Sequence, residues 1–179
     1  VGVVTDYSIK NVEDWKKLHV LPMDEGSMKD TIDAAKGVID HYKGEAPVVV
    51  TVFNSLTTAQ KMSGDKMFIH MRQNPEAFRE GIETITQTTI NYVKELVNAG
   101  ADGIFFASQL GNYDKMSVAE YETFGRPYDL SILEHAKKMW FNIMHMHGNA
   151  PMFEMMSQYP VQALNWHDRL VDIDLRKGR

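Results

Sequence analysis

Residues 139–169, MWFNIMHMHGNAPMFEMMSQYPVQALNWHDR, decide how the rest of the chain is interpreted. They predict a strand, a polar turn, a helix, a second strand and a second polar turn. Each apolar run ends in polar side chains, which are His145 and His147 after the first run and Asn165, His167 and Asp168 after the second. Parallel α/β enzymes build their active sites at the carboxyl ends of strands. The stretch therefore predicts an α/β fold with a functional site at these two strand ends.

Working outward, four short apolar runs predict strands, at residues 47–53, 103–107, 140–144 and 161–164. The clearest helix is expected over residues 74–98, because Asn74 is a good N-cap, Pro75 suits the first turn and Gly100 suits the end. Further helices are expected over residues 11–18, 26–42, 56–62, 128–139 and 152–159, with a short one opened by the capping box Ser117-Val-Ala-Glu120.

Strands and helices thus alternate, which predicts a parallel sheet, either doubly wound or closed as a (β/α)8 barrel. A complete barrel needs about 250 residues, so the four strands correspond to about half of one. An incomplete barrel leaves open strand edges. Residues 1–179 are therefore expected to be a single segment of a barrel domain whose N-terminal and C-terminal parts are missing here, and the absent initial Met fits a fragment.

The composition narrows the class of protein. The chain has 179 residues, of which 44% are hydrophobic, and a formal net charge of −5, with Lys and Arg scattered apart from the closing Arg176–Arg179. This balance argues against a nucleic-acid partner. The absence of cysteine excludes disulfides, cysteine nucleophiles and thiolate metal ligands within these residues, and it favours the cytoplasm. A membrane partner is not expected, because no apolar run is long enough to cross a bilayer and the start is unlike a signal peptide.

Five segments, in order, resemble motifs of the uroporphyrinogen decarboxylase superfamily. They are Phe53–Ala59 (like P-x-T-x-A), Asn98–Ser108 (AGAD…F-x-S), Ser117–Tyr128 (s-x-x-x-Y-x-x-F-x-x-P-Y), His145–Gly148 (H-x-C-G) and Val161–Trp166 (a strand ending in D-W or N-W). The resemblance implies a (β/α)8 barrel with its pocket at the carboxyl ends of the strands. It also implies one of two activities, removal of acetate carboxyls from a tetrapyrrole or zinc-dependent transfer of a methyl group between a corrinoid protein and a thiol.

Two features separate these activities. The substrate-contacting tyrosine of the decarboxylases corresponds by position to Lys61 in this chain. The essential aspartate and arginines of the decarboxylases belong to an N-terminal part of the family sequence that precedes residues 1–179. The methyltransferases bind zinc through His-x-Cys and a later cysteine, which would lie beyond Arg179. Here the pair is His145-x-His147. Residues i and i+2 of a strand point the same way, and two neutral imidazoles suit zinc, so the sequence leans toward methyl transfer.

The candidate site residues follow. His145 and His147 are assigned to a metal, with hydrogen bonding to a carboxylated substrate as the alternative. Ser108 matches the substrate-contacting serine of the family, and the strand-end residues Asn54 and Gln109 join it as substrate-binding candidates. His167 and Asp168 are the catalytic candidates, with a solvated loop as the alternative. The remaining histidines are expected to be surface or core residues: His19, His41, His70 and His135.

Cofactors and partners follow the same division. Methyl transfer implies zinc and a corrinoid as partner or substrate, whereas decarboxylation implies a tetrapyrrole substrate and no cofactor; either is compatible with a homo-oligomer. Two alternatives remain open. His-x-His at a strand end also suits a metal-dependent hydrolase with further His and Asp ligands at later strands. The barrel is also compatible with a corrinoid or tetrapyrrole carrier that lacks catalysis.

Overall fold

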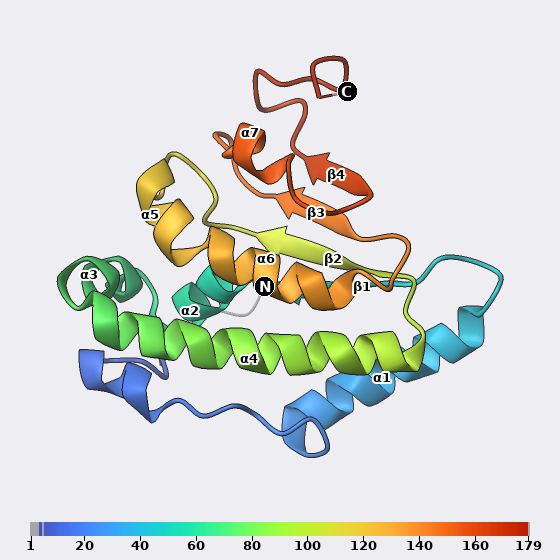
Figure 1. Ribbon diagram of the computed structural model, residues 1–179, viewed down its shortest axis with the longest axis horizontal. Coiled ribbons are helices and arrows are strands. Elements are labelled where there is room, and N and C mark those ends of the chain that lie inside the picture. Colours follow the sequence, from blue (N-terminus) through green and yellow to red (C-terminus); the bar gives the residue numbers. More distant parts are fainter. Residues whose placement is uncertain (1–3, 5, 179) are drawn as a thin grey trace.

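The computed structural model describes residue 4 and residues 6–178, so Arg179 of the closing basic stretch lies outside the described residues. Its core is a four-stranded parallel sheet made of β1 (Val49–Phe53), β2 (Gly103–Ser108), β3 (Ile143–Met146) and β4 (Ala163–Trp166) (Figure 1). The predicted parallel α/β fold is confirmed. A doubly wound sheet reverses its strand order at a switch point. Here the strands follow chain order in one direction, as they do in a (β/α)8 barrel.

Helices precede β1 and connect the successive strands. They are the 3-10 helix Val12–Lys17, α1 (Gly26–Tyr42), α2 (Ser55–Ser63), α3 (Lys66–Gln73), α4 (Pro75–Ala99), α5 (Val118–Phe124), α6 (Arg126–Ala136) and α7 (Phe153–Met156). No helix within the described residues combines the length and the apolarity that crossing a membrane requires.

Several other helices pack against the long helix α4 (Figure 1). It begins at Pro75, where the missing N–H costs nothing, and it ends at Gly100, whose φ of 84° is left-handed. Its buried face includes Phe78, Ile82 and Leu96, and it contacts the 3-10 helix, α1, α2, α3 and α6. The prediction for this helix is confirmed, because its apolar stripe and the Pro and Gly signals at its ends are local features of the sequence. Asn74 holds the N-cap position, but its side chain makes no capping hydrogen bond.

The predicted bounds of the last two strands were two to three residues too early. Residues 140–144 and 161–164 were expected, but the ladders begin later because Asn142 ends the preceding turn. Its buried side chain donates to the carbonyl oxygens of Ala136 (3.0 Å) and Met139 (3.2 Å), and its N–H donates to Gln162 Oε1 (2.8 Å). Strand β3 therefore starts only at the next residue and includes His145.

Two helix predictions also need correction, and one helix was missed. The helix expected over residues 128–139 is α6, which starts earlier, at Arg126, because Pro127 fits its first turn instead of preceding it. The helix expected over residues 152–159 is a single turn, α7, followed by isolated turns up to Pro160. Helix α3 was not predicted.

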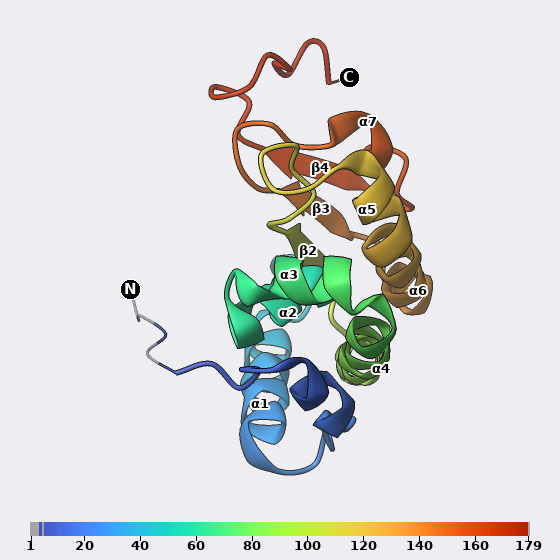
Figure 2. The ribbon, with the colours of Figure 1, turned by 90° about the vertical axis from the view of Figure 1, so that its left-hand side faces the viewer.

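The two faces of the sheet differ in burial, since successive strand residues point to opposite sides. Helices α4, α5 and α6 lie along one face (Figure 2), where the buried strand residues are Val52, Ile104, Phe106, Met144 and Met146. Most side chains of the other face are exposed or half-buried, among them Phe53, Phe105, His145 and Asn165. The face away from the helices is therefore where strand side chains meet solvent or a ligand.

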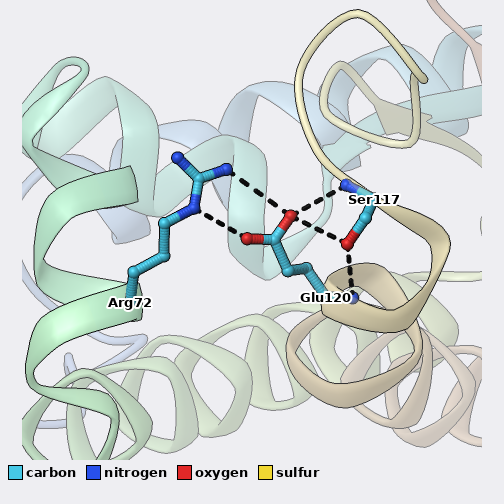
Figure 3. Close-up of polar contacts among 3 residues, drawn as sticks. All are labelled: Arg72, Ser117 and Glu120. Carbon is cyan, nitrogen blue, oxygen red and sulfur yellow. Dashed lines mark hydrogen bonds and ion pairs between the residues drawn. The ribbon is translucent and has the colours of Figure 1, made fainter.

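An ion pair joins two helices at the carboxyl end of the sheet (Figure 3). Arg72 of α3 donates through Nε to Glu120 Oε1 of α5 (2.7 Å). Glu120 also accepts from the backbone N–H of Ser117 (2.8 Å), whose Oγ in turn accepts from the N–H of Glu120 (3.2 Å). The predicted capping box is thus confirmed. The hydrogen bond from Arg72 holds the pKa of Glu120 at about 2, below its ordinary value.

Gly103 at the start of β2 permits a close approach that no other residue allows. A Cβ atom there would lie 1.8 Å from the carbonyl oxygen of Phe141. We expect Gly103→Ala to lower the free energy of unfolding by about 1–3 kcal/mol or more, as overpacking does. Gly37→Ala in α1, where a Cβ meets nothing within 4 Å, should instead raise it by up to about 1 kcal/mol. Urea unfolding of the two variants measures both effects, and unchanged stability of Gly103→Ala would contradict the close approach.

Candidate metal and substrate site

The carboxyl ends of the four strands form one edge, as the sequence predicts. In the ladder, Phe53, Ala107, His145 and Asn165 are aligned across β1 to β4. Asn54 directly follows this row, and Ser108 ends β2. Parallel strands bring polar residues that follow their ends to the same side of the molecule, so the candidate residues share this edge.

Three histidines meet at this edge. His145 lies in β3, His147 follows β3 by one residue, and His167 directly follows β4. Their ring centroids are 5.8 Å (145 to 147), 5.9 Å (145 to 167) and 5.2 Å (147 to 167) apart. Each ring offers a nitrogen, and these three atoms all lie within 4.8 Å of one another. We call these residues the histidine cluster.

The separation of two nitrogens in the cluster fits a shared metal ion. His147 Nδ1 and His167 Nε2 are 3.4 Å apart, which is long for a hydrogen bond. Two nitrogen ligands of a tetrahedral zinc ion, each about 2.0–2.1 Å from the metal, lie about 3.3 Å apart. The donor set is made of imidazoles alone, which suits zinc and other transition metals. The residues present therefore fit the metal that the resemblance implies.

His145 is held in one orientation. Its Nδ1 lies 2.6 Å from Asn165 Oδ1, and its ring stacks on Phe105 with centroids 4.9 Å apart. An amide oxygen only accepts, so Nδ1 carries the proton and Nε2 is free to bind a metal. Burial lowers the pKa of His145 and the two neighbouring histidines lower it further, whereas the hydrogen bond that His145 donates to Asn165 raises it. These effects favour the neutral imidazole, the form that binds metals.

Asn54 and Ser108, the two predicted substrate-binding residues, lie in a buried polar network. Asn54 Nδ2 is 3.3 Å from Ser108 Oγ, 3.0 Å from Tyr121 Oη and 3.0 Å from Asp129 Oδ1. The hydroxyls of Tyr121 (2.6 Å) and Tyr159 (3.0 Å) donate to Asp129 Oδ2. Asn54 also caps α2 by accepting from the N–H of Thr57 (3.0 Å). Asn54 and Ser108 are almost completely buried. That they bind substrate stays a prediction.

The other two predicted residues lie nearer to solvent. Gln109 is half-buried beside Ser108, and its backbone N–H donates to Thr57 Oγ1 (2.9 Å). Asp168 is half-buried next to His167, and its N–H donates to the carbonyl oxygen of Trp166 (3.1 Å). Both residues lie at the strand edge that carries the histidine cluster. Their assigned roles, substrate binding for Gln109 and catalysis for Asp168, stay predictions.

A family model described as uroporphyrinogen decarboxylase (URO-D) matches residues 1–178. The chain belongs to this family. The superfamily resemblance seen in the sequence is thereby confirmed.

Two curated proteins that are similar to this chain have different activities. A methylcobamide:CoM methyltransferase MtbA of Methanosarcina mazei is 26% identical over 177 residues, which cover 98% of this chain and 52% of that protein. A uroporphyrinogen decarboxylase of Carboxydothermus hydrogenoformans is 25% identical over 176 residues, 92% of this chain and 49% of that protein. The chain thus spans about half the length of these relatives. Both relatives are enzymes, and their identities do not choose between the two reactions.

A solved structure agrees with the fold. A methyltransferase from Methanosarcina mazei superposes with a TM-score of 0.78 at 19% sequence identity, covering 90% of this chain and 48% of that one. This likeness concerns the fold alone. It agrees with the expectation that four parallel strands form about half of a (β/α)8 barrel.

Sequence reasoning missed part of the site. Tyr121, Asp129 and Tyr159 complete the buried network, and Asn165 orients His145. A signal existed for Tyr121, which is the tyrosine of the URO-D family motif in Ser117–Tyr128. No local pattern marks Asp129, which lies next to that motif but reaches a residue 75 positions away.

Asp129 makes stability depend on pH. Burial raises the pKa of its carboxyl from 3.8 to about 7, although hydrogen bonds from Tyr121, Asn54 and Tyr159 lower it. Between these values the folded chain holds one proton more than the unfolded chain. The free energy of unfolding therefore falls as the pH rises through this window, by up to about 1.4 kcal/mol per pH unit, and this contribution levels off above pH 7.

Asp129→Asn removes this contribution because the amide has no proton to lose. We expect the difference in unfolding free energy between parent and variant to decrease from pH 4 to pH 7 and then to stay constant. Urea unfolding at half-unit intervals measures it. Asp114→Asn, at an exposed aspartate, should keep the slope of the parent. Parallel curves for the parent and Asp129→Asn would show that Asp129 is ionised throughout.

Proposed function

We propose that this chain carries the metal site of a URO-D family methyltransferase that acts on a thiol with a corrinoid-linked methyl donor. The observation that supports this most is the histidine cluster, in which His145, His147 and His167 bring one ring nitrogen each within 4.8 Å of the others. These three residues would hold a zinc ion. The methylcobamide:CoM methyltransferase of Methanosarcina mazei, 26% identical, supports the choice of methyl transfer.

The histidine cluster alone supplies three protein ligands, so the proposed site requires no cysteine. The sequence has no cysteine, and His147 stands where the family motif has one. His167, assigned to catalysis from the sequence, is proposed here as the third ligand. Three protein ligands leave one position of a tetrahedral zinc ion open. When bound, zinc supplies a positive charge that stabilises a thiolate at neutral pH and thereby activates a thiol substrate.

The residues of the chain provide the setting for that substrate. Asn165 keeps Nε2 of His145 unprotonated through its bond to Nδ1, so this histidine donates a lone pair at any pH at which it is neutral. Phe105, which stacks on His145, offers an apolar surface beside the cluster, and Phe53 lies two strands away in the row of His145. Asp168, adjacent to His167, is proposed to accept or return a proton at a carboxylate oxygen. Gln109 is proposed to bind substrate, and the cytoplasm is the proposed location.

Decarboxylation of a tetrapyrrole is the second candidate. The 25% identity to the Carboxydothermus hydrogenoformans decarboxylase supports it, and it needs no metal. In that case the histidine cluster would hydrogen-bond the carboxylates of the substrate. Lys61, whose ammonium nitrogen lies 4.5 Å from the ring centroid of Phe53, would add a positive charge beside the same face.

Metal binding distinguishes the two candidates. We expect about one zinc ion per chain in the purified protein, measured by elemental analysis. His147→Ala and His167→Ala should each weaken zinc binding by about 100-fold or more in chelator competition, because even the loss of an outer hydrogen bond to a ligand costs about 10–100-fold. His41→Ala, which removes an exposed histidine of α1, should leave the affinity unchanged.

The opposite result has a clear meaning. If the parent protein, His41→Ala and His147→Ala all bind no zinc at micromolar concentrations, zinc-dependent methyl transfer is ruled out. Decarboxylation is then the supported function. Zinc binding that survives His167→Ala would instead return His167 to a catalytic role.

A further inference from the structure

The loops that follow β2 and β3 are joined to each other close to His147. Asn112 forms an antiparallel bridge with Pro151. On either side of it, the N–H of Tyr113 donates to the carbonyl oxygen of Ala150 (2.8 Å), and the N–H of Met152 donates to that of Gly111 (2.9 Å). Backbone hydrogen bonds therefore tie the two loops to each other.

His147 depends on this junction because it lies outside β3. Its N–H donates to the carbonyl oxygen of Ser108 (3.1 Å), and its own carbonyl oxygen accepts from Asn112 Nδ2 (3.2 Å). Both polar backbone groups of His147 are thus bonded to the β2 side of the site. The side chain of His147 is exposed, so the burial that restrains His145 does little to restrain this ring.

The amide of Asn112 has only one orientation that satisfies its neighbours. Its Oδ1 accepts from the N–H of Asp114 (2.9 Å), which leaves Nδ2 to face His147. Only 4% of the residue is exposed. Gly148 adds a second constraint, because a Cβ there would lie 2.1 Å from Asn112 Nδ2 and its φ of 96° is left-handed. The backbone that follows His147 packs directly on this amide.

We infer that Asn112 is a positioning residue that sets His147 at the distance from His167 that a shared metal requires. The inference rests on the proposed metal site. A ligand on a loop loses conformational freedom when metal binds, and fixing its backbone in advance reduces that cost. The hydrogen bond from Asn112 fixes the carbonyl of His147, and the bond to Ser108 fixes the N–H.

The buried network extends this positioning into the core. Ser108 Oγ accepts from the N–H of Gly111 (3.2 Å) and also contacts Asn54 and Tyr121. The loop that carries Asn112 therefore starts from a residue held by the network around Asp129. This connection gives Asn54 and Ser108 a function that needs no contact with substrate.

Asn112→Ser is the sharpest test. A serine hydroxyl at this position can still accept from the N–H of Asp114, as in an ST turn, but it is too short to reach the carbonyl of His147. We expect zinc affinity, measured by chelator competition, to fall about tenfold or more, in the range known for outer-shell partners. Asn149→Ser is the matched control in the next loop, because Asn149 is exposed; it should bind zinc as the parent does.

A double-mutant comparison separates positioning from general loosening of the fold. In a His147→Ala background, Asn112→Ser should cause no additional loss of zinc affinity, because the ligand it positions is gone. An equal loss in both backgrounds would overturn the inference in favour of a structural role, as would unchanged affinity of Asn112→Ser alone. Absence of zinc binding by the parent would overturn the proposed function and this inference together, whereas the other two results leave the proposed function standing.

Discussion

The site depends on the in-register hydrogen bonding of four parallel strands. The ladder aligns Phe53, Ala107, His145 and Asn165 in one row. Histidines that lie 20 positions apart in the chain reach one another only because β3 and β4 end at the same level. Shifting either strand by one residue would turn its side chains to the other face and separate the three imidazoles.

The site has two layers with different physical characters. The outer layer is the histidine cluster, which meets solvent on the face away from the helices. The inner layer is the network around Asp129, whose carboxyl accepts hydrogen bonds from Asn54, Tyr121 and Tyr159. Buried polar groups that are all satisfied stiffen their surroundings. Ser108 belongs to both layers, since its hydroxyl joins the network and its carbonyl holds the backbone of His147.

Much of the fold could be predicted from local signals. Helix α4 carries its own apolar stripe and end signals, and the short apolar runs marked the strands. The bounds of β3 and β4 could not be predicted, because no apolar pattern marks the side-chain hydrogen bond from Asn142 back to Ala136, and its backbone partner Gln162 lies 20 positions away. The alternation of helices and strands predicted a parallel sheet, but only the observed strand order excludes a doubly wound arrangement within the described residues.

The candidate site was predictable to a similar degree. The spacing of His145 and His147 predicted that their rings share a face, and the strand-end position of His167 predicted that it lies nearby. The spacing did not predict that His147 leaves the strand and is held by a neighbouring loop. The spacing also did not predict that Asn54 and Ser108 turn inward. Asn54 bonds to Ser108, 54 positions later, and to Asp129, 75 positions later, and no local pattern marks such distant contacts.

The alternation along β3 links folding to chemistry. Met144 and Met146 point into the core and are fully buried, whereas His145 between them points to the open face. Any change that slides this strand by one position would put thioethers in the site and imidazoles in the interior at the same moment. A register shift of β3 would therefore disrupt the candidate site and the core together.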